Sequence, residues 1–373
     1  MYASYVPNLR FPEFQGEWEK CKLRDVCTFL SGGTPKVDVK EYWNGTIPFV
    51  SAISMHDTYI LDSKLHISEE GLKHGSRLLT KNNLLLLVRG SMLWNTIPIC
   101  LNKSDVAFNQ DVKGIIANDT INNEFLLYWL KSKEQRLKYM VTGTGLGAGK
   151  LDTSDLLSMI VYIPAMKEQD KVARLLSLFD ERIATQHKVI DKLQSLIKGI
   201  AQKIVRSNKP NVRLTECMEC KSSTLQESEV CEQGTYPVYG ANGIVGYLDN
   251  YNTEGEAIYI IKDGSGVGTV SYVTGKCSAT GTLNTLQTKE GYSLQYLYYL
   301  LKVFNFEPYK TGMAIPHIYF KDYGKAKVFC PSYTEQLQYA RLLSAIEGKL
   351  STEKNILTSL SLQKQYLLRQ MFI

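Results

Sequence analysis

A segment in the middle of the chain returns near its end, and this duplication constrains the fold more than any other feature. The fourteen residues 164–177 return as 331–344 with eight identities, and the same spacing of 167 residues aligns 144–205 with 311–372. A repeat of this length is too long for a solenoid and suits a domain followed by a helix. The sequence therefore predicts two similar halves, which suit a partner with two similar sites, and double-stranded DNA is the commonest such partner.

The repeat also sets the expected domain boundaries. We predict a first α+β domain over 1–163, a long helix over 164–208, a second α+β domain over 209–330 and a long helix over 331–373. Both domains are expected to combine a curved, loop-rich sheet with one clear helix. Strands are predicted at 26–30, 47–51, 84–88, 257–262 and 269–273, and the two helices at 123–133 and 293–303.

Each long helix is predicted from apolar residues that recur at alternating steps of four and three, which is a heptad pattern. Both helices begin with a proline and an acidic residue, and Pro210 follows the end of the first. Two such helices in one chain should pair as a coiled coil, and a two-fold relation between the halves makes the pair antiparallel. The predicted seam consists of Val172, Leu176, Phe179, Ile183, Gln186, Ile190, Leu193, Leu343, Ile346, Leu350, Glu353, Leu357 and Leu360.

Polar residues interrupt this seam at Gln186, Glu353 and Lys364. In an antiparallel pair Gln186 and Glu353 flank the centre, where a contact between them would fix the register at some cost in stability. A position at the solvated edge of the seam is the alternative for both residues.

Composition and charge narrow the class of protein. The net charge of +6 suits a polyanion partner without requiring one. The first ten residues lack the apolar core of a signal peptide, and the aliphatic run at 84–88 is far too short to span a membrane. We therefore expect a cytoplasmic protein with no membrane partner, whose eight cysteines are mostly reduced thiols.

Few motifs indicate chemistry. Cys217 and Cys220 have metal-ligand spacing, and Cys231 and Cys277 are the available further ligands, but without a second spaced pair we predict no metal site. The glycine-rich segment 143–150 fails the phosphate-loop pattern and is either a DNA phosphate contact or a flexible turn. Similarly, 264–268 is no dinucleotide fingerprint. No nucleophile–base pair and no Pro-Pro dipeptide occurs, so we expect no catalytic residue and no cofactor in this chain.

With its halves laid out, the chain resembles the specificity (S) subunit of type I restriction–modification systems. The features that carry the resemblance are Trp18, Leu23, the Gly-Thr-Pro turn at 33–35, Ile47-Pro48, Arg89-Gly90-Ser91 and the two Pro-x-x-x-Glu-Gln helix starts at Pro164 and Pro331. The resemblance covers essentially the whole chain.

The resemblance implies a non-catalytic subunit with two target recognition domains, each reading one half of a bipartite DNA site. The paired helices would set the gap and hold two methyltransferase subunits, which carry S-adenosylmethionine for DNA methylation. Two restriction subunits with ATP- and Mg-dependent translocase and nuclease activity would complete the restriction system. The second domain lacks the Gly-Thr-Pro turn, so the full site should be asymmetric. A coiled-coil adaptor without DNA specificity is the alternative.

Candidate DNA contacts are polar or basic residues in predicted loops, because such side chains reach phosphates and base edges. Each is either a base reader, a phosphate contact or an ordinary surface residue. The candidates are Lys36, Arg89, Ser91, Asn109, Gln110, Lys150, Lys262, Ser265, Thr280, Thr282, Asn284 and His317.

Overall fold

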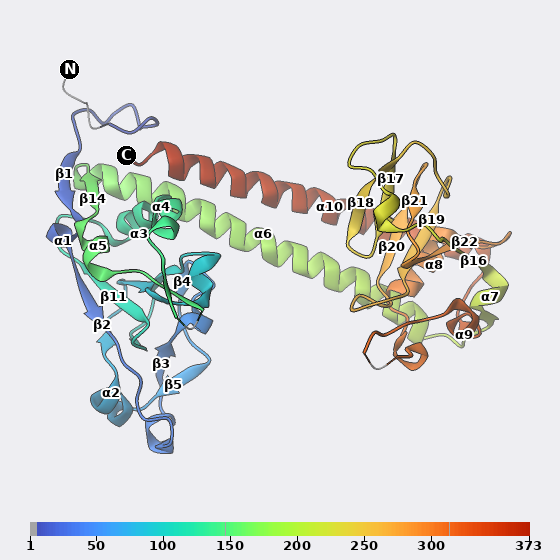
Figure 1. The fold of residues 1–373 in the computed structure, drawn as a ribbon, viewed down its shortest axis with the longest axis horizontal. Helices are drawn as coiled ribbons and strands as arrows, with labels where there is room; N and C mark the ends of the chain where they lie inside the picture. The colour runs from blue at the N-terminus through green and yellow to red at the C-terminus, as the bar shows by residue number, and fades with distance from the viewer. Residues whose placement is uncertain (1–5, 146, 313) are drawn as a thin grey trace. The chain divides into compact units, whose positions relative to one another are not determined.

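The structure, a computed structural model, describes residues 6–145, 147–312 and 314–373. It divides into two compact units, one formed by Met1–Gln186 with Ile356–Ile373 and the other by His187–Asn355. Each unit holds a sheet-bearing part and a section of each long helix (Figure 1). We call residues 19–163 the first sheet domain and residues 212–328 the second sheet domain.

The first sheet domain is built on two main sheets. The larger has the order β2 (Cys27–Ser31), β11 (Val112–Ala117), β7 (Leu84–Leu87), β9 (Ile99–Asn102) and β4 (Tyr59–Ile60), and the smaller has the order β5 (Leu65–Ile67), β3 (Ile47–Val50), β10 (Val106–Phe108) and β6 (Leu78–Leu79). Strand β1 (Glu19–Lys22) pairs with β14 (Ile160–Ile163), and β12 (Thr142–Thr144), β13 (Ala148–Lys150) and β8 (Arg89–Gly90) form a third small sheet. The helices are α1 (Leu23–Val26), α2 (Glu69–Gly75), α3 (Asn123–Ser132), α4 (Glu134–Tyr139) and α5 (Thr153–Ser158).

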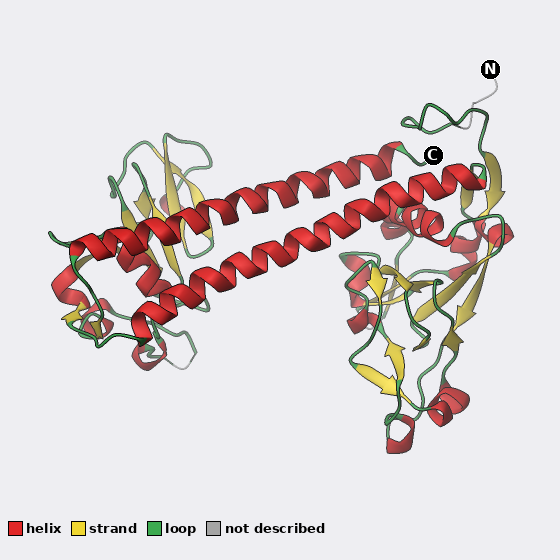
Figure 2. Cartoon of the chain, turned by 180° about the vertical axis from the view of Figure 1, so that it is seen from behind, coloured by secondary structure: helices red, strands yellow, loops and turns green. Residues whose placement is uncertain are grey.

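The second sheet domain repeats this plan with fewer elements. Figure 2 shows the strands and short helices of both sheet domains. Its larger sheet has the order β16 (Met218–Ser222), β22 (Leu283–Thr288), β19 (Ala257–Ile261) and β20 (Val270–Val273), and its smaller has the order β18 (Gly243–Leu248), β17 (Tyr236–Gly240) and β21 (Ser278–Ala279). Strand β15 (Val212–Arg213) pairs with β23 (Lys327–Val328), and the helices are α7 (Leu214–Cys217), α8 (Leu294–Lys302) and α9 (Phe320–Tyr323). Each smaller sheet contains one parallel pair, β3 with β10 and β17 with β21, beside antiparallel ones.

Both long helices of the repeat are continuous, α6 over Met166–Arg206 and α10 over Tyr333–Gln370. In the first unit the beginning of α6 packs on the end of α10, where Asp180 meets Lys364. In the second unit the end of α6 and the beginning of α10 line one cleft together, with Ala201 and Leu350 on its walls. The helices therefore pair antiparallel in each unit, which confirms the predicted α+β fold with an antiparallel coiled coil.

The repeated Pro-x-x-x-Glu-Gln motif has the same structural role in both units. Gln169 is buried, donates to the carbonyl of Pro164 (2.9 Å) and accepts from the backbone N–H of Asn122 (2.8 Å), the N-cap of α3. Gln336 does the same with Pro331 (2.9 Å) and with Ser293 (2.9 Å), the N-cap of α8. The glutamine thus fastens each long helix to the short helix of its sheet domain, and the two prolines lie just ahead of the helices that they were predicted to begin.

The thirteen predicted seam positions are all buried or partly buried, from Val172 to Leu360. The polar interruption at Lys364 has a partner, because its ammonium pairs with the Asp180 carboxylate. Gln186 is buried, and its contact with Glu353 stays a prediction. The predicted strands and short helices agree with the structure to within one or two residues at each end. No helix in the described ranges is both long and apolar enough to cross a membrane.

Candidate nucleic-acid interface

The first-domain candidates come from four segments that backbone hydrogen bonds tie together, and Arg89 and Lys150 lie on the short strands β8 and β13. Asp111 accepts at its carbonyl from the backbone N–H groups of Val88 (2.8 Å) and Arg89 (3.3 Å), and Leu151 donates to the carbonyl of Val88 (2.8 Å). The turn at 32–35 joins the same group, since Gly33 donates to the carbonyl of Phe108 (3.0 Å). The structure therefore places these candidates on neighbouring segments: Lys36, Arg89, Ser91, Asn109, Gln110 and Lys150.

Some of these side chains already have partners. Gln110 accepts from the hydroxyl of Thr34 (2.7 Å), and Asn109 donates to the carboxylate of Asp111 (3.3 Å). Lys150 lies 3.5 Å from Asp152. Arg89, Ser91 and Lys36 are exposed. Because exposed cations meet phosphates at low desolvation cost, the basic members of the group suit a polyanion surface.

The glycine-rich segment forms a hairpin of β12 and β13, in which Thr142 pairs with Lys150 and Gly149 pairs with Gly90 of β8. Leu146, which belongs to this segment, lies outside the described residues. Trp94, half exposed, donates its indole N–H to the carbonyl of Gly147 (3.0 Å) and so holds the hairpin from one side. Gly147 has a φ of +76°, which glycine adopts without strain. The segment is thus a braced hairpin carrying Lys150, rather than an unsupported turn.

The second-domain candidates separate into exposed and buried positions. Lys262, Thr282 and His317 are partly exposed and Ser265 is exposed. Thr280 and Asn284 are buried, at 1% and 3% exposed, and Asn284 donates to the hydroxyl of Tyr323 (3.2 Å). A side chain must be exposed to contact a base edge. Because these two side chains are buried, they stabilise the local structure and do not belong to the candidate interface.

His317 and Lys262 lie next to each other through the backbone. Ile318 donates to the carbonyl of Lys262 (2.9 Å), and Lys262 donates to the carbonyl of Thr282 (3.0 Å). The imidazole Nδ1 of His317 lies 2.6 Å from the carboxylate of Asp263. The sequence analysis did not select Asp263, although it predicted that a buried strand ends at the preceding residue, Lys262.

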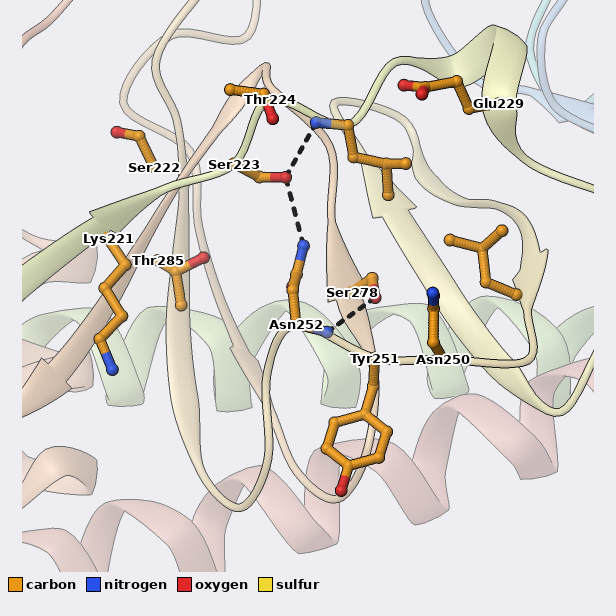
Figure 3. A pocket seen from close by; sticks show the side chains of 12 residues that line it. Lys221, Ser222, Ser223, Thr224, Glu229, Asn250, Tyr251, Asn252, Ser278 and Thr285 are labelled. Carbon is orange, nitrogen blue, oxygen red and sulfur yellow. Dashed lines mark hydrogen bonds between the residues drawn. The ribbon is translucent and has the colours of Figure 1, made fainter.

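A polar groove in the second sheet domain was also missed (Figure 3). Asn252 organises it, because its side-chain amide donates to the hydroxyl of Ser223 (3.2 Å) and its backbone N–H donates to the hydroxyl of Ser278 (3.1 Å). Lys221 and Tyr251 stand among its lining residues. The groove lies at the end of β16, and the first domain has its Gly-Gly-Thr-Pro turn at the corresponding end of β2. The only signal for this groove is that β16 and β2 occupy the same position in their sheets, so that the segments after them correspond.

A polar cluster joins the first sheet domain to the long helices of its unit. The hydroxyl of Tyr128 donates to Asp180 (2.8 Å), which also pairs with Lys364, and Tyr59 lies 3.0 Å from Tyr128. Lys131 donates to the hydroxyl of Thr58 (2.7 Å). Burial, followed by the positive charge of Lys364, lowers the pKa of Lys131 to about 8. Burial likewise raises the pKa of Tyr128, so this phenol stays protonated.

The second unit has a counterpart at the same repeat positions, with Glu347 in place of Asp180. Tyr299 donates to Glu347 (2.7 Å), as do Lys302 (3.0 Å) and Tyr298 (3.2 Å). Burial works to raise the pKa of Glu347, but hydrogen bonds from Tyr299 and Lys302 outweigh it and hold this pKa below its usual range. Ile197, the repeat position of Lys364, lines the cleft beside this carboxylate. Both clusters fasten a long helix to a sheet domain.

The long helices of the first unit also present an apolar surface. Leu178, Leu362 and Tyr366 are 44%, 60% and 59% exposed. They border two adjoining grooves with Phe179 on a shared wall. The repeat positions in the second unit are smaller or polar, and they are Ala345, Ser195 and Gly199. We call Leu178, Leu362 and Tyr366 the apolar helix face.

The cysteines that were considered as possible metal ligands differ in their exposure. Cys231 is exposed, while Cys217 and Cys277 are buried, and the sulfur of Cys277 lies 3.2 Å from the hydroxyl of Tyr259. In the described part of the chain no three His, Cys, Asp or Glu side chains are placed to hold a metal ion.

The fold and the loop clusters define a duplicated α+β protein with two sheet domains on one helix pair. A family model for the type I restriction modification DNA specificity domain matches the chain twice, over residues 15–195 and 207–362. The chain therefore belongs to the type I restriction–modification specificity family, as its resemblance indicated.

Curated relatives bear the same description. The specificity subunit of the Escherichia coli type I restriction enzyme EcoR124I/EcoR124II is 30% identical over 174 residues, which are 46% of this chain and 43% of that subunit. The Escherichia coli EcoprrI specificity subunit is 23% identical over 371 residues, 92% of this chain and 90% of that one. Over the first three relatives, the aligned region spans 42–43% of each relative's length.

Solved structures show the same fold. The S subunit of a type I restriction–modification system from M. genitalium aligns with a TM-score of 0.67 at 20% identity, covering 99% of both chains. A chain from a structure of type I restriction–modification complex assembly aligns with a TM-score of 0.55 at 14% identity, covering 95% of this chain and 97% of that one.

Proposed function

We propose that this chain is the DNA specificity subunit of a type I restriction–modification complex, and that each sheet domain reads one half of a bipartite, asymmetric DNA site. The observation that carries the proposal is a loop group at the same place in both sheet domains, after β7 in the first and after β19 in the second. Its side chains differ between the domains, so the two half-sites differ in sequence. Membership of the specificity family supports the same function.

Phosphate contacts position such a protein, and base contacts specify the sequence. In the first domain the exposed Lys36 is proposed to contact phosphate, while Arg89 and Lys150 lie side by side across two strands. In the second domain Lys262, Ser265, Thr282 and His317 take the corresponding surface. These groups offer the donors and acceptors that major-groove readout needs.

The paired helices are proposed to set the gap between the half-sites and to hold two methyltransferase subunits. The apolar helix face supports this role, because large exposed apolar side chains grouped along a groove are typical of docking surfaces. Two restriction subunits would then join the assembled methyltransferase.

Chemistry is assigned to the partners and not to this chain. S-adenosylmethionine would be held by the methyltransferase subunits, and ATP and Mg²⁺ by the restriction subunits. The polar clusters support a scaffold role, because Tyr128 and Lys131 hold α3 to Asp180 of the long helix and to Thr58 through hydrogen bonds.

The test is sequencing of methylated adenine in DNA from cells that express this chain with its cognate methyltransferase subunit. A single two-part motif with a fixed gap and unlike halves is the expected result. If the purified complex forms but no motif gains methylation, the sequence-specific role is wrong and a scaffold without DNA specificity takes its place.

A further inference from the structure

We propose that Asp263 and His317 form the specificity-determining pair of the second sheet domain, at the position where the first domain presents Arg89 and Lys150. This inference rests on the proposed DNA recognition and names the residues through which the second half-site is distinguished from the first.

The β-ladders establish that the two pairs occupy one position in the common plan. In the first domain Arg89 comes two residues after the end of β7 and is the cross-strand partner of Lys150. In the second domain Asp263 comes two residues after the end of β19 and is the cross-strand partner of His317. The next backbone bond is also shared, since Leu151 donates to the residue before Arg89 and Ile318 donates to the residue before Asp263. His317 lies 167 residues after Lys150, which is the repeat spacing.

The chemistry at this shared position is opposite. Arginine and lysine offer only hydrogen-bond donors, which match the O6 and N7 acceptors of guanine. A carboxylate accepts only, and an imidazole carries one donor and one acceptor when neutral. A change from two donors to an acceptor and a mixed group alters which base edge fits, whereas the cross-strand pairing and the next backbone hydrogen bond are the same in both domains.

The Asp263–His317 pair is also fixed in orientation. The carboxylate can only accept, so the 2.6 Å contact assigns the proton to Nδ1 and leaves Nε2 for an outside partner. The two side chains are about one-third exposed, at 35% for His317 and 33% for Asp263. One side of the imidazole is close to the ring of Tyr319, with the centroids 6.5 Å apart and the planes 18° apart. Asp263 is therefore a positioning residue for a histidine that remains accessible.

The surrounding backbone holds this arrangement. Thr311 and His317 exchange backbone hydrogen bonds of 2.9 and 2.7 Å, and Gly264 donates to the carbonyl of Pro316 (3.0 Å). Gly312 has a φ of +86°, and a Cβ there would meet the carbonyl oxygen of Ile315 at 2.4 Å. In the first-domain hairpin Thr144 pairs with Ala148. In the second domain the repeat position of Thr144 is Thr311, and it pairs with His317, the repeat position of Lys150. The second-domain pairing therefore encloses more residues.

The experiment uses the full chain co-expressed with its methyltransferase subunit and reads methylated adenine across the genome. The variants are His317→Gln, Asp263→Asn and the exchange Asp263→Arg with His317→Lys, which installs the first-domain pair. Glu290→Gln, an exposed side chain between β22 and α8, is the matched control in the same unit. The first half-site in each variant motif is an internal control for folding and assembly.

The expected result is a change at one position of the second half-site only. Discrimination there should fall by about ten-fold in the single variants, which is the order expected when one well-placed base contact is lost, and the exchange should shift the preference toward guanine. For variants that methylate DNA too weakly for the motif to be sequenced, the affinity of the purified complex is measured on duplexes substituted at each position of the second half-site. This measurement gives the base preference directly. An unchanged second half-site in all three variants overturns the inference. A wild-type complex with no motif instead overturns the proposed function itself.

Discussion

The two sheet domains share their central strands and differ at their loops. The order β2-β11-β7-β9 of the first corresponds to β16-β22-β19-β20 of the second, and both domains close with a pair that joins their first and last strands. The first domain adds α2, α4 and a complete hairpin, whereas the second replaces its glycine turn by a polar groove. Burial constrains the shared strands, while the loops carry little of the core and are free to take different chemistry.

The polar clusters that attach the long helices to the sheet domains also differ between the two units. Asp180 and Glu347 occupy one repeat position and both accept from a tyrosine of the short helix. Asp180 is more deeply buried, at 13% exposed against 33%, and its lysine comes from the other long helix. We therefore expect the stability of the first unit to depend more strongly on its carboxylate than the stability of the second unit does.

Removing these carboxylates gives the largest expected effect. Asp180→Ala leaves Lys364 buried without its partner and should lower the free energy of unfolding of the first unit by about 3 kcal/mol. Glu347→Ala should cost the second unit only about 1 kcal/mol, because its pair is partly solvated. All four tryptophans (Trp18, Trp43, Trp94 and Trp129) lie in the first unit, so their fluorescence during urea unfolding reports on Asp180→Ala alone. Hydrogen exchange of α8 reports on Glu347→Ala. Equal losses in the two units would contradict the comparison.

A charge on the apolar helix face should weaken methyltransferase capture next most strongly. Tyr366→Glu places a carboxylate in the proposed interface and is expected to cost about 2 kcal/mol, or about thirty-fold in affinity. Gly199→Glu, at the repeat position in the second unit, has open space around the new side chain and should change affinity by less than about three-fold. Native mass spectrometry of the assembled complex measures both. Full occupancy in Tyr366→Glu would remove the apolar helix face from the docking surface.

The number of phosphate contacts should be larger by about one in the first domain, which has Lys36 where the second domain has Glu227. Lys36→Ala is expected to weaken DNA binding by about ten-fold without altering the motif, and to reduce the slope of log affinity against log salt by about one. Glu227 lies at the same distance after β16, and Glu227→Lys should raise that slope by about one. Filter binding at several salt concentrations tests the pair. A changed motif in Lys36→Ala would instead make Lys36 a base reader.

The smallest expected effect is on the pH dependence of stability. The pKa of Lys131 is about 8 in the folded chain and near 10.5 in the unfolded chain, so between these values the unfolded chain binds more protons and stability rises with pH. Between pH 8 and pH 9 this rise amounts to about 1 kcal/mol, and Lys131→Met should remove it. The pKa of Lys302 is raised, so its contribution has the opposite sign and is lost at high pH. Lys302→Met is the control. It should leave the pH dependence of the free energy of unfolding of the first unit, measured by tryptophan fluorescence, unchanged.

Much of the fold was predictable because its signals are local. The heptad steps that predicted the seam from Val172 to Leu360 depend only on neighbours three and four residues apart. The buried runs at 84–88 and 257–262 predicted strands for the same reason. The candidate site was less predictable: Arg89 and Lys150 were chosen separately, and only the ladder between β8 and β13 makes them neighbours. Thr280 and Asn284 were chosen by loop context, which says nothing of burial.

The sequence by itself determined that the chain has two similar halves, two long helices and a set of buried strands, since repetition and periodicity are written along the chain. The tertiary structure alone decided that Asp180 accepts from both Tyr128 and Lys364, and that Asp263 meets His317 across 54 residues. The physical reason is that strand register and helix packing bring distant residues within hydrogen-bond distance, and neither leaves a local pattern in the sequence.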